Sequence, residues 1–560
     1  MDIDNLLELP GPRCLEDIIF TEDDIVESVK RIPTQSSPGP DGIPAKLLKE
    51  CIHELKKPLY KLWRTSLDQG KIPENVKFSH VSPIFKKGDK SLPKNYRPIS
   101  LTSHVGKLFE RLVVKHITGY LNSMNLFNSE QHGFRTGRSC LSQLLEHQQK
   151  ILASLEAGTN LDIVYLDFAK AFDKVDYGIL LSKLRSIGIS GSLLRWLNSF
   201  LTNRKQAINI EGHLSSEGPV TSGVPQGSSL GPLLFLVHIA DISGDVENTA
   251  VSSFADDTRV SMRVNSEEDS HKMQADLEKI YNWAVCNNMS FNANKFELLR
   301  YSSNENEKLP YYTPEGTTIT EVTQVRDLGI VMENTGGFQS QIAQAVKRST
   351  NMASWVLRVF KTRDELSMMT LYKSMVMPHV EYCCQLWSPH PLGDIRKLEA
   401  VQRSFTARIF GLSSLSYWDR LKHLNLYSLE RRRERYILLY TFKIVRGLVP
   451  NLVDNRFSIK VHQSVSGSRL CRIPAISRAS KAKTRSMVEY SFAIQGPRLF
   501  NCLPAELRNF QGSFLAFKGK LDKLLNEVYD KPCSPGYHQS ATSNSIIHQN
   551  AKMRAVGAHF

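Results

Sequence analysis

Three aspartates carry the clearest chemical signal in this sequence. Asp256 and Asp257 are adjacent in SSFADDTRVSM, and Asp167 ends the apolar run IVYLD earlier in the chain. An adjacent pair alone suits a solvated turn equally well, but a third carboxylate at a strand end favours a shared site. Clustered carboxylates need a counter-charge, which a hard divalent cation such as Mg²⁺ supplies. Two such ions about 3.5–4 Å apart stabilise both the attacking and the leaving oxygen of a phosphoryl displacement.

The elements expected around these aspartates place them on one sheet edge. Ile163–Leu166 is predicted as a buried strand, followed by a helix from about Phe172. Alternating apolar and polar residues on both sides of FADD predict a β-hairpin whose tip carries the pair. An apolar helix from about Leu230 and an amphipathic helix with Met273 and Leu277 on one face are also expected. This order predicts an α+β domain, an antiparallel sheet with helices on one face.

The charge of the chain is distributed unevenly. Residues 1–340 carry a net charge of −5 and residues 341–560 carry +20; within the first part, 51–140 carry +10 and 241–340 carry −9. Two basic zones around an acidic one suit a protein that binds a polyanion and gathers carboxylates between its ends. Solvated surface charge is the simpler explanation of any single run, but an asymmetry of this size favours nucleic acid as a partner.

The sequence indicates an intracellular protein, nuclear or cytoplasmic and not secreted. Its nine cysteines show neither CxxC pairs nor Cys/His ligand spacing, which favours reduced thiols. The first residues, MDIDNLLELPGPR, lack the basic and apolar regions of a signal peptide. No run of about 18 apolar residues predicts a membrane span.

Eight motifs in order resemble those of one enzyme family. VYLDFAKAFDKVDY, SGVPQGSSLGPLLFLVHI and FADDTRV resemble the A, B and C motifs of reverse transcriptases of non-LTR (LINE-type, jockey-like) retrotransposons. SSPGPDGIPAKLL, NYRPISL, QHGFRTGRSC, VRDLGI and CCQLWSP match the same family. The resemblance implies an RNA-directed DNA polymerase, a nucleotidyltransferase that extends a primer 3′-OH with dNTPs. Its partners would be template RNA and primer DNA, and its cofactor two Mg²⁺ ions, for which Mn²⁺ can substitute.

The resemblance also implies a right-hand polymerase fold, with fingers, an antiparallel-sheet palm and a helical thumb, plus a basic helical C-terminal extension. We expect, in chain order, a leader at 1–30, fingers at 31–160, the catalytic palm at 161–340, the thumb at 341–450, the C-terminal extension at 451–530 and a disordered tail at 531–560. The tail is rich in Ser, His and Asn and has few apolar residues.

Carried over by position, the catalytic residues are the three aspartates. Asp167 and Asp256 would bind both metal ions, together with the backbone carbonyl of Phe168, and Asp257 would be a less direct ligand. Phe172 occupies the steric-gate position, where an aromatic ring would exclude a ribose 2′-OH. A plain core role for this ring is the alternative, and both can hold.

The remaining dNTP contacts implied by the family lie on three loops. Pro225, Gln226 and Gly227 match the loop that lies against the incoming nucleotide, where glycine permits a close backbone approach. Arg97 matches an arginine that contacts the triphosphate, which suits bidentate phosphate recognition. Lys86 or Lys87 would be its companion. Lys295 matches a lysine that protonates the departing pyrophosphate, although NKFE departs from the family pattern, and a surface lysine is the alternative.

The basic C-terminal half predicts contacts to a primer–template duplex. Arg431, Arg432 and Arg435 form the densest cluster, and Arg431 and Arg435 share a helix face at i,i+4. Such contacts would bind the phosphate backbone without reading sequence. Glu110 is expected on a helix surface, and His132 in a structural role.

Two alternatives stay open. The chain begins about 30 residues before SSPGPDG, so we expect it to lack the endonuclease domain that usually precedes the polymerase in this family. It would then be either an active polymerase or a catalytically degenerate or co-opted RNA/DNA-binding remnant. A group II intron-type maturase shares the polymerase motifs, but VRDLGI and CCQLWSP favour the retrotransposon kind.

Overall fold

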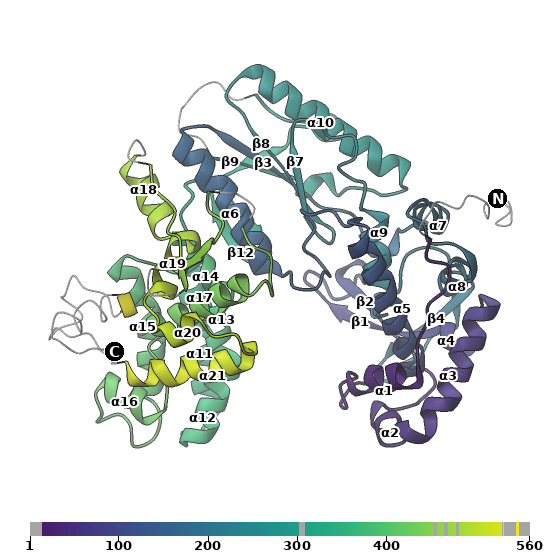
Figure 1. The fold of residues 1–560 in the computed structure, drawn as a ribbon, viewed down its shortest axis with the longest axis horizontal. Helices are drawn as coiled ribbons and strands as arrows, with labels where there is room; N and C mark the ends of the chain where they lie inside the picture. The colour runs from purple at the N-terminus through teal and green to yellow at the C-terminus, as the bar shows by residue number, and fades with distance from the viewer. Residues whose placement is uncertain are drawn as a thin grey trace.

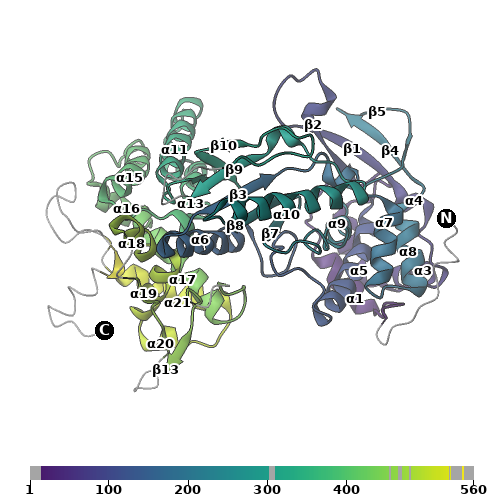
Figure 2. The ribbon, with the colours of Figure 1, turned by 90° about the horizontal axis from the view of Figure 1, so that it is seen from above.

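The computed structural model describes residues 14–301, 309–452, 456–463, 469–477, 481–528, 530 and 545–547. Helices and sheets are mixed in the first part of the chain, and helices dominate the second (Figure 1). Two lobes lie on either side of a central sheet, and the view from above shows the same order (Figure 2). Among the described residues, no helix is both long and apolar enough to cross a membrane.

The N-terminal lobe combines a helical layer with a small sheet. Its helices are α1 (Glu22–Lys30), α2 (Ala45–Glu50), α3 (Ile52–Gln69), α4 (Glu74–Lys77), α5 (His104–Ser123), α7 (Tyr177–Ser186) and α8 (Gly191–Leu201). Its sheet has the order β2-β1-β4-β5, with β6 also paired to β4; the strands are β1 (Phe78–Phe85), β2 (Tyr96–Leu101), β4 (Arg204–Ile210), β5 (His213–Leu214) and β6 (Gly218–Val220). Phe109 stacks on Trp63 with ring centroids 4.6 Å apart and meets Trp196 edge-on, which joins α3, α5 and α8.

Two expected divisions of this part differ in the structure. Residues 177–220, expected in the palm, pack in the N-terminal lobe, because β4 pairs in parallel with β1 and α8 packs on α3. The described part of the expected leader, 14–30, also belongs to this lobe: α1 packs against α3 and α5 and buries Ile25 and Val29. Apolar burial joins these segments although the sequence separates them.

The central sheet has the order β10-β9-β3-β8-β7. Its strands are β3 (Leu161–Leu166), β7 (Ala250–Phe254), β8 (Asp257–Arg263), β9 (Glu297–Tyr301) and β10 (Thr320–Val322). β3 is antiparallel to both β8 and β9. The predicted buried strand and hairpin are confirmed, and α9 (Gly231–His238) and α10 (Glu267–Cys286) follow the predicted positions.

The sheet is covered on both faces, so the prediction of helices on one face is wrong. Val164 and Leu166 of β3 belong to the core shared with α9 and α10, whereas Leu161 and Ile163 belong to the core shared with α6 (Cys140–Ala157). Figure 1 shows α10 above the sheet and α6 below it. A strand buried on both faces is mostly apolar rather than alternating. LDIVYL has that pattern apart from Asp162, whose buried carboxylate pairs with Arg300.

The C-terminal part begins with a short hairpin, β11 (Gln324–Asp327) and β12 (Ile330–Glu333). Helices follow: α11 (Gln339–Val359), α12 (Glu365–Leu371), a π-helical turn (Tyr372–Val376), α13 (Met377–Glu381), α14 (Cys384–Trp387), α15 (Leu392–Thr406), α16 (Tyr417–His423) and α17 (Leu429–Val445). Beyond them lie β13 (Val461–Gln463), β14 (Arg469–Cys471), α18 (Ala482–Glu489), α19 (Phe492–Asn501), α20 (Ala505–Arg508) and α21 (Phe514–Glu527).

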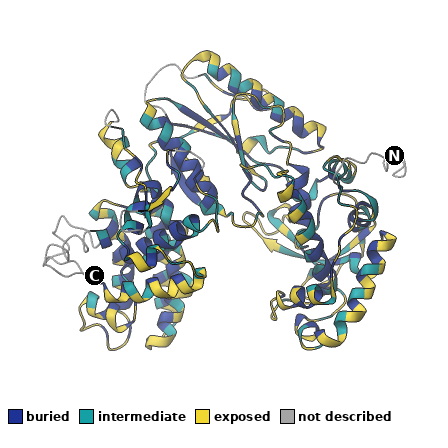
Figure 3. Cartoon of the chain, viewed as in Figure 1, coloured by how far each residue is buried: buried dark blue, intermediate teal, exposed yellow. Residues whose placement is uncertain are grey.

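Helix α17 lies at the centre of this part. It packs against α14, α15, α19 and α21, and the buried interior is dark blue in Figure 3. The expected boundary at 450 therefore does not separate two cores, because α17 and α19 share one. Of the predicted disordered tail, all but 545–547 lies outside the described residues, and Ile546 is buried against the rest.

Candidate active site

The β7–β8 hairpin brings Asp256 and Asp257 to one end of the central sheet. Ala255 and Asp256 form a two-residue turn, with Phe254 paired to Asp257. In the neighbouring pairing Leu166, the last residue of β3, lies opposite Thr258. Asp167 therefore leaves the sheet directly beside the turn. Ala255 has φ 56°, a left-handed conformation that is costly for a residue with a Cβ atom.

The three carboxylates influence one another electrostatically. Burial raises the pKa of Asp256, and the charge of Asp167 adds to the effect. Asp257 keeps an exposed surface, yet the surrounding protein displaces part of its hydration. That loss, with the charges of Asp256, Asp327 and Asp167, raises the pKa of Asp257 to about 6. The protein thus leaves negative charge at this sheet end only partly neutralised.

Lys295 lies against the first of these carboxylates. Its Nζ is 2.6 Å from Asp167 Oδ2, and the backbone N–H of Asn292 donates to the Asp167 carbonyl at 2.7 Å. Within the described ranges, no three His, Cys, Asp or Glu side chains are arranged as a finished metal site. The donor set nevertheless fits a divalent cation, because carboxylate oxygens are its preferred ligands and their charge is incompletely balanced.

Residues of the N-terminal sheet direct positive charge at the same place. Arg97 on β2 and Lys86, just after β1, both lower the pKa of Asp256 through their charges. The predicted Arg97 thus lies within electrostatic range of the aspartates. Of the two lysines left open, this interaction favours Lys86 over Lys87.

The loop at Pro225–Gly227 makes hydrogen bonds both to β2 and to the segment that contains Phe172. The backbone N–H of Ser100 donates to the Gln226 carbonyl at 2.7 Å, and the Gln226 amide donates to Asp173 at 2.8 Å. Gly227 has φ 129°, and a Cβ atom there would lie 2.4 Å from the Ser100 carbonyl oxygen. This position therefore requires glycine. Phe172 belongs to a 3-10 turn, not the start of the predicted helix.

The ring of Phe172 is held by two other phenylalanines. It stacks on Phe235 of α9 with ring centroids 4.3 Å apart, and Phe134 approaches it edge-on at 6.0 Å. Phe168 is turned into the core, where it stacks on Phe291 at 4.4 Å. Its side chain is thereby anchored, which fixes the backbone next to Asp167.

The comparison with known proteins assigns this arrangement to a family. Residues 84–332 match the family model described as reverse transcriptase (RNA-dependent DNA polymerase). These residues are a reverse transcriptase domain. It contains the three aspartates, Arg97, Phe172, the Gln226 loop and Lys295, whereas the cluster on α17 lies outside it.

Relatives of the reverse transcriptase domain come from mobile elements of Drosophila melanogaster. The chain is 26% identical over 401 residues to a probable RNA-directed DNA polymerase from transposon X-element, covering 70% of this chain and 44% of that protein. It is 25% identical to a probable RNA-directed DNA polymerase from transposon BS, with shares of 76% and 48%. For the RNA-directed DNA polymerase from mobile element jockey the identity is 26%, and the shares are 73% and 46%.

These matches confirm the resemblance to the enzymes of jockey-like elements. The chain spans less than half the length of these three relatives. Among solved structures, apo telomerase from Candida tropicalis, truncated from the C-terminal domain, aligns with a TM-score of 0.34 and 12% identity over 51% of this chain and 59% of that one. A likeness at this level carries no argument.

Glu110 corrects a prediction about the reverse transcriptase domain. It was expected on a helix surface, but it is only 4% exposed and accepts hydrogen bonds from the backbone N–H groups of Ser229 at 2.6 Å and Leu230 at 3.0 Å. These two residues directly precede α9. A carboxylate there pairs with free helix N–H groups and with the positive end of the helix dipole. Glu110 therefore anchors the end of the Pro225–Gly227 loop.

The arginine cluster on α17 is also different from its prediction. Arg431 is fully buried, and its guanidinium contacts the Val528 carbonyl. Arg435 makes two hydrogen bonds to Asp522 of α21, and Arg432 pairs with Glu381. The structure contradicts a surface track of these arginines, because α17 is enclosed by helices on several sides.

Two site residues escaped the sequence reasoning. Gln131 and Gly133 of QHGF contact the turn that carries Asp256. In the sequence, QHGF indicates only a match to the family, because a glycine next to a polar residue does not show which strand it will contact. His132 is buried, and its ring lies within hydrogen-bonding distance of Ser142 and Glu146 of α6; its structural role stays a prediction.

Proposed function

We propose that this chain is an RNA-directed DNA polymerase that joins a dNTP to a primer 3′-OH on a template RNA. The observation that carries the proposal is the meeting of three carboxylates at one sheet end, inside the reverse transcriptase domain and within reach of Arg97 and Lys86. Phosphoryl transfer needs carboxylates that can bind metal ions. It also needs basic side chains, here Arg97 and Lys86, that can bind the triphosphate.

Asp167, Asp256 and the Phe168 carbonyl would hold the metal ions, with Asp257 in support. Two Mg²⁺ ions, or Mn²⁺ in their place, would supply positive charge at the attacking and leaving oxygens. Arg97 and Lys86 would bind the triphosphate. Phe172, fixed by its stack on Phe235, would exclude a ribose 2′-OH.

Two further residues would orient the nucleotide and complete proton transfer. The hydrogen bond from the Gln226 amide to Asp173 orients this side chain on the loop. Lys295 would donate a proton to the departing pyrophosphate, which requires it to leave Asp167 when a cation binds there.

For the domains, we propose fingers formed by the N-terminal lobe including 177–220, a palm formed by the central sheet with α6, α9 and α10, and a combined thumb and C-terminal extension from 339 to 528. The groups that would bind dNTPs lie on the first two. We further propose an intracellular site of action, nuclear or cytoplasmic, which the cysteine pattern of the sequence supports because it shows neither CxxC pairs nor Cys/His ligand spacing.

Primer extension tests this function directly. Purified protein with oligo(dT) on poly(rA) and Mg²⁺ or Mn²⁺ should incorporate dTTP, and the Asp256→Asn variant should not. Extension that persists in Asp256→Asn would refute the assigned site, and a wild-type protein without extension would refute the function.

A second candidate is a nucleic-acid-binding remnant without catalysis. The ion pair of Lys295 with Asp167 favours it, because a lysine here already neutralises one expected metal ligand. This candidate predicts RNA binding that weakens steeply between about 50 and 200 mM salt, with no dNTP incorporation. Detectable extension would eliminate it.

A further inference from the structure

Residues 130–133 lie along the outer edge of β7, beside the candidate active site. The backbone N–H of Ser253 donates to the Glu130 carbonyl, and the N–H of His132 donates to the Ser253 carbonyl, both at 3.1 Å. Gln131 and Ser253 form a parallel bridge. This short segment therefore pairs with the edge strand β7 at Ser253, just before the turn that carries Asp256.

The side chain of Gln131 reaches the turn itself. Its Oε1 accepts hydrogen bonds from the backbone N–H of Ala255 at 3.0 Å and from that of Gly133 at 2.8 Å, and Gln131 is only 6% exposed. The N–H of Ala255 is buried and belongs to the residue with φ 56°. Without the glutamine oxygen, this donor would lose the acceptor that holds the left-handed conformation, at the cost of an unsatisfied buried group.

Gly133 closes the same contact from the other side. A Cβ atom at this position would lie 2.4 Å from the Ala255 nitrogen and 3.0 Å from the Phe254 carbonyl carbon. The backbone of residue 133 therefore presses against the turn, and only glycine fits. The turn is held by a hydrogen bond and by a close backbone approach at once.

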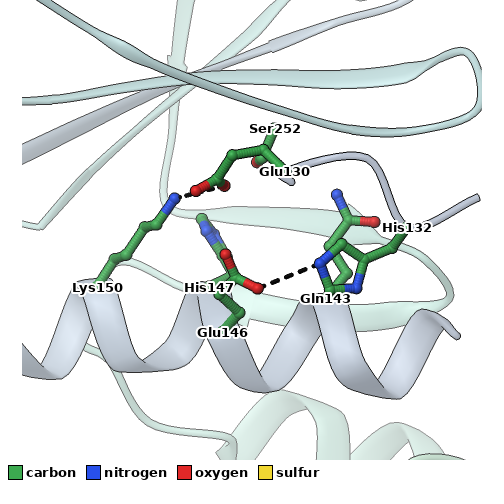
Figure 4. Close-up of a pocket in the computed structure, with 7 residues that line it drawn as sticks. All are labelled: Glu130, His132, Gln143, Glu146, His147, Lys150 and Ser252. Atoms are coloured by element: carbon green, nitrogen blue, oxygen red, sulfur yellow. Dashed lines mark hydrogen bonds and ion pairs between the residues drawn. The ribbon is translucent and has the colours of Figure 1, made fainter. Parts of the chain in front are cut away.

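Helix α6 holds the segment in place from below. Lys150 pairs with Glu130 at 2.7 Å, and His132 lies 3.1 Å from Glu146 and 2.7 Å from Ser142. In Figure 4, Lys150 and Glu146 of α6 point toward Glu130 and His132 of the segment, and dashed lines mark both contacts. Three polar contacts to α6 fix the position of residues 130–132 relative to β7.

We propose that Gln131 is a positioning residue for Asp256. Its amide oxygen holds Ala255 in the left-handed conformation, so that the next residue, Asp256, stays within range of Asp167. The proposal rests on the proposed function only in taking Asp256 as a metal ligand. The hydrogen bond from Ala255 to Gln131 explains the left-handed conformation of the turn, whereas the aspartates themselves do not.

The Gln131→Met variant tests the proposal, because it keeps the length of the side chain and removes the acceptor. We expect Mn²⁺ binding to the nucleotide-free protein, followed by the EPR signal of free Mn²⁺, to weaken about tenfold. The kcat of primer extension should fall about tenfold or more, with the KM for dTTP changed less than about threefold. A glutamine with a merely structural role would lower the melting temperature and leave Mn²⁺ affinity unchanged.

Gln143→Met is the matched control. Gln143 is a buried glutamine on α6, and within the described residues its side-chain amide has no hydrogen-bond partner. Its replacement should leave Mn²⁺ affinity and kcat within about twofold of wild type. Ala255→Gly, which removes the cost of a positive φ, should recover part of the Mn²⁺ affinity lost in Gln131→Met. The double variant also serves if Gln131→Met alone does not fold.

Each outcome decides the matter. Equal Mn²⁺ affinity in wild type and Gln131→Met, an equal loss in Gln143→Met, or wild-type protein that binds no Mn²⁺ would each overturn the proposal. A wild type that binds Mn²⁺ but does not extend primers would refute the proposed function alone. In that case the comparison of Mn²⁺ affinities still tests the role of Gln131.

Discussion

Replacing Glu110 by alanine should destabilise the N-terminal lobe by about 3–5 kcal/mol. Glu110 is 4% exposed and accepts two hydrogen bonds from backbone donors just before α9, of which Leu230 is buried and Ser229 half-buried. A buried donor left without an acceptor costs about 1–3 kcal/mol. The charge of Arg204, only 3% exposed, would also lose its buried counter-charge. Glu110→Gln keeps one acceptor oxygen and should cost about 1–2 kcal/mol.

Urea unfolding followed by tryptophan fluorescence measures this loss. Lys115→Ala is the matched control on the same helix, because its side chain is 64% exposed and pairs with Asp24 at the surface. It should change stability by about 0.5 kcal/mol or less. If Glu110→Ala costs under about 1 kcal/mol, the carboxylate does not anchor the helix start. A normal KM for dTTP in a destabilised Glu110→Ala variant would show that the Pro225–Gly227 loop does not depend on this anchor.

Three further predictions concern charges. The pKa of Asp257, about 6 against an ordinary 3.8, means that its ionised form destabilises the metal-free fold; the penalty is absent below about pH 4, grows up to about pH 6 and stays above it. Asp257→Asn should therefore raise stability at pH 8, by about 1 kcal/mol after solvent screening, and should not raise it at pH 4. An equal gain in melting temperature at both pH values would contradict a destabilising effect of the ionised Asp257. Lys295→Met should change stability by less than about 1 kcal/mol, because the side chains of Lys295 and Asp167 are 56% and 32% exposed. Mn²⁺ titration of this variant should show tighter binding, because the lysine no longer competes with the metal ion for Asp167. Weaker Mn²⁺ binding would contradict that competition. Arg435→Gln should lower the melting temperature through loss of the Asp522 pair and leave the salt dependence of RNA binding unchanged; a shallower slope of log K against log salt would return this arginine to the nucleic-acid surface.

The sequence predicted the elements whose signals are local. The apolar run at β3 and the alternation around FADD each identify a strand by side-chain period alone, and both strands are confirmed. Their pairing places the aspartates of both at one sheet end.

What the sequence could not supply are partners that lie far away along the chain. The parallel pairing of β4 with β1 depends on residues more than a hundred positions apart, so 177–220 could not be assigned to the N-terminal lobe. Helical spacing places Arg431 and Arg435 on one face of α17, but it does not show which helices cover that face. Burial of Glu110 likewise depends on α9, whose start lies over a hundred residues further on.

Helix α6 sets the size of the folding unit. The family match ends at residue 332, yet the lower face of the central sheet, with Ile163 and Tyr301, is buried in a core that α6 shares with helices α14, α17 and α19. A chain cut after 332 would keep α6 on the sheet but lose the helices that complete this core, which leaves the outward side of α6 exposed to water. The segment that the family model matches is therefore smaller than the packed unit around it, and the C-terminal helices supply the other half of the core beneath the central sheet.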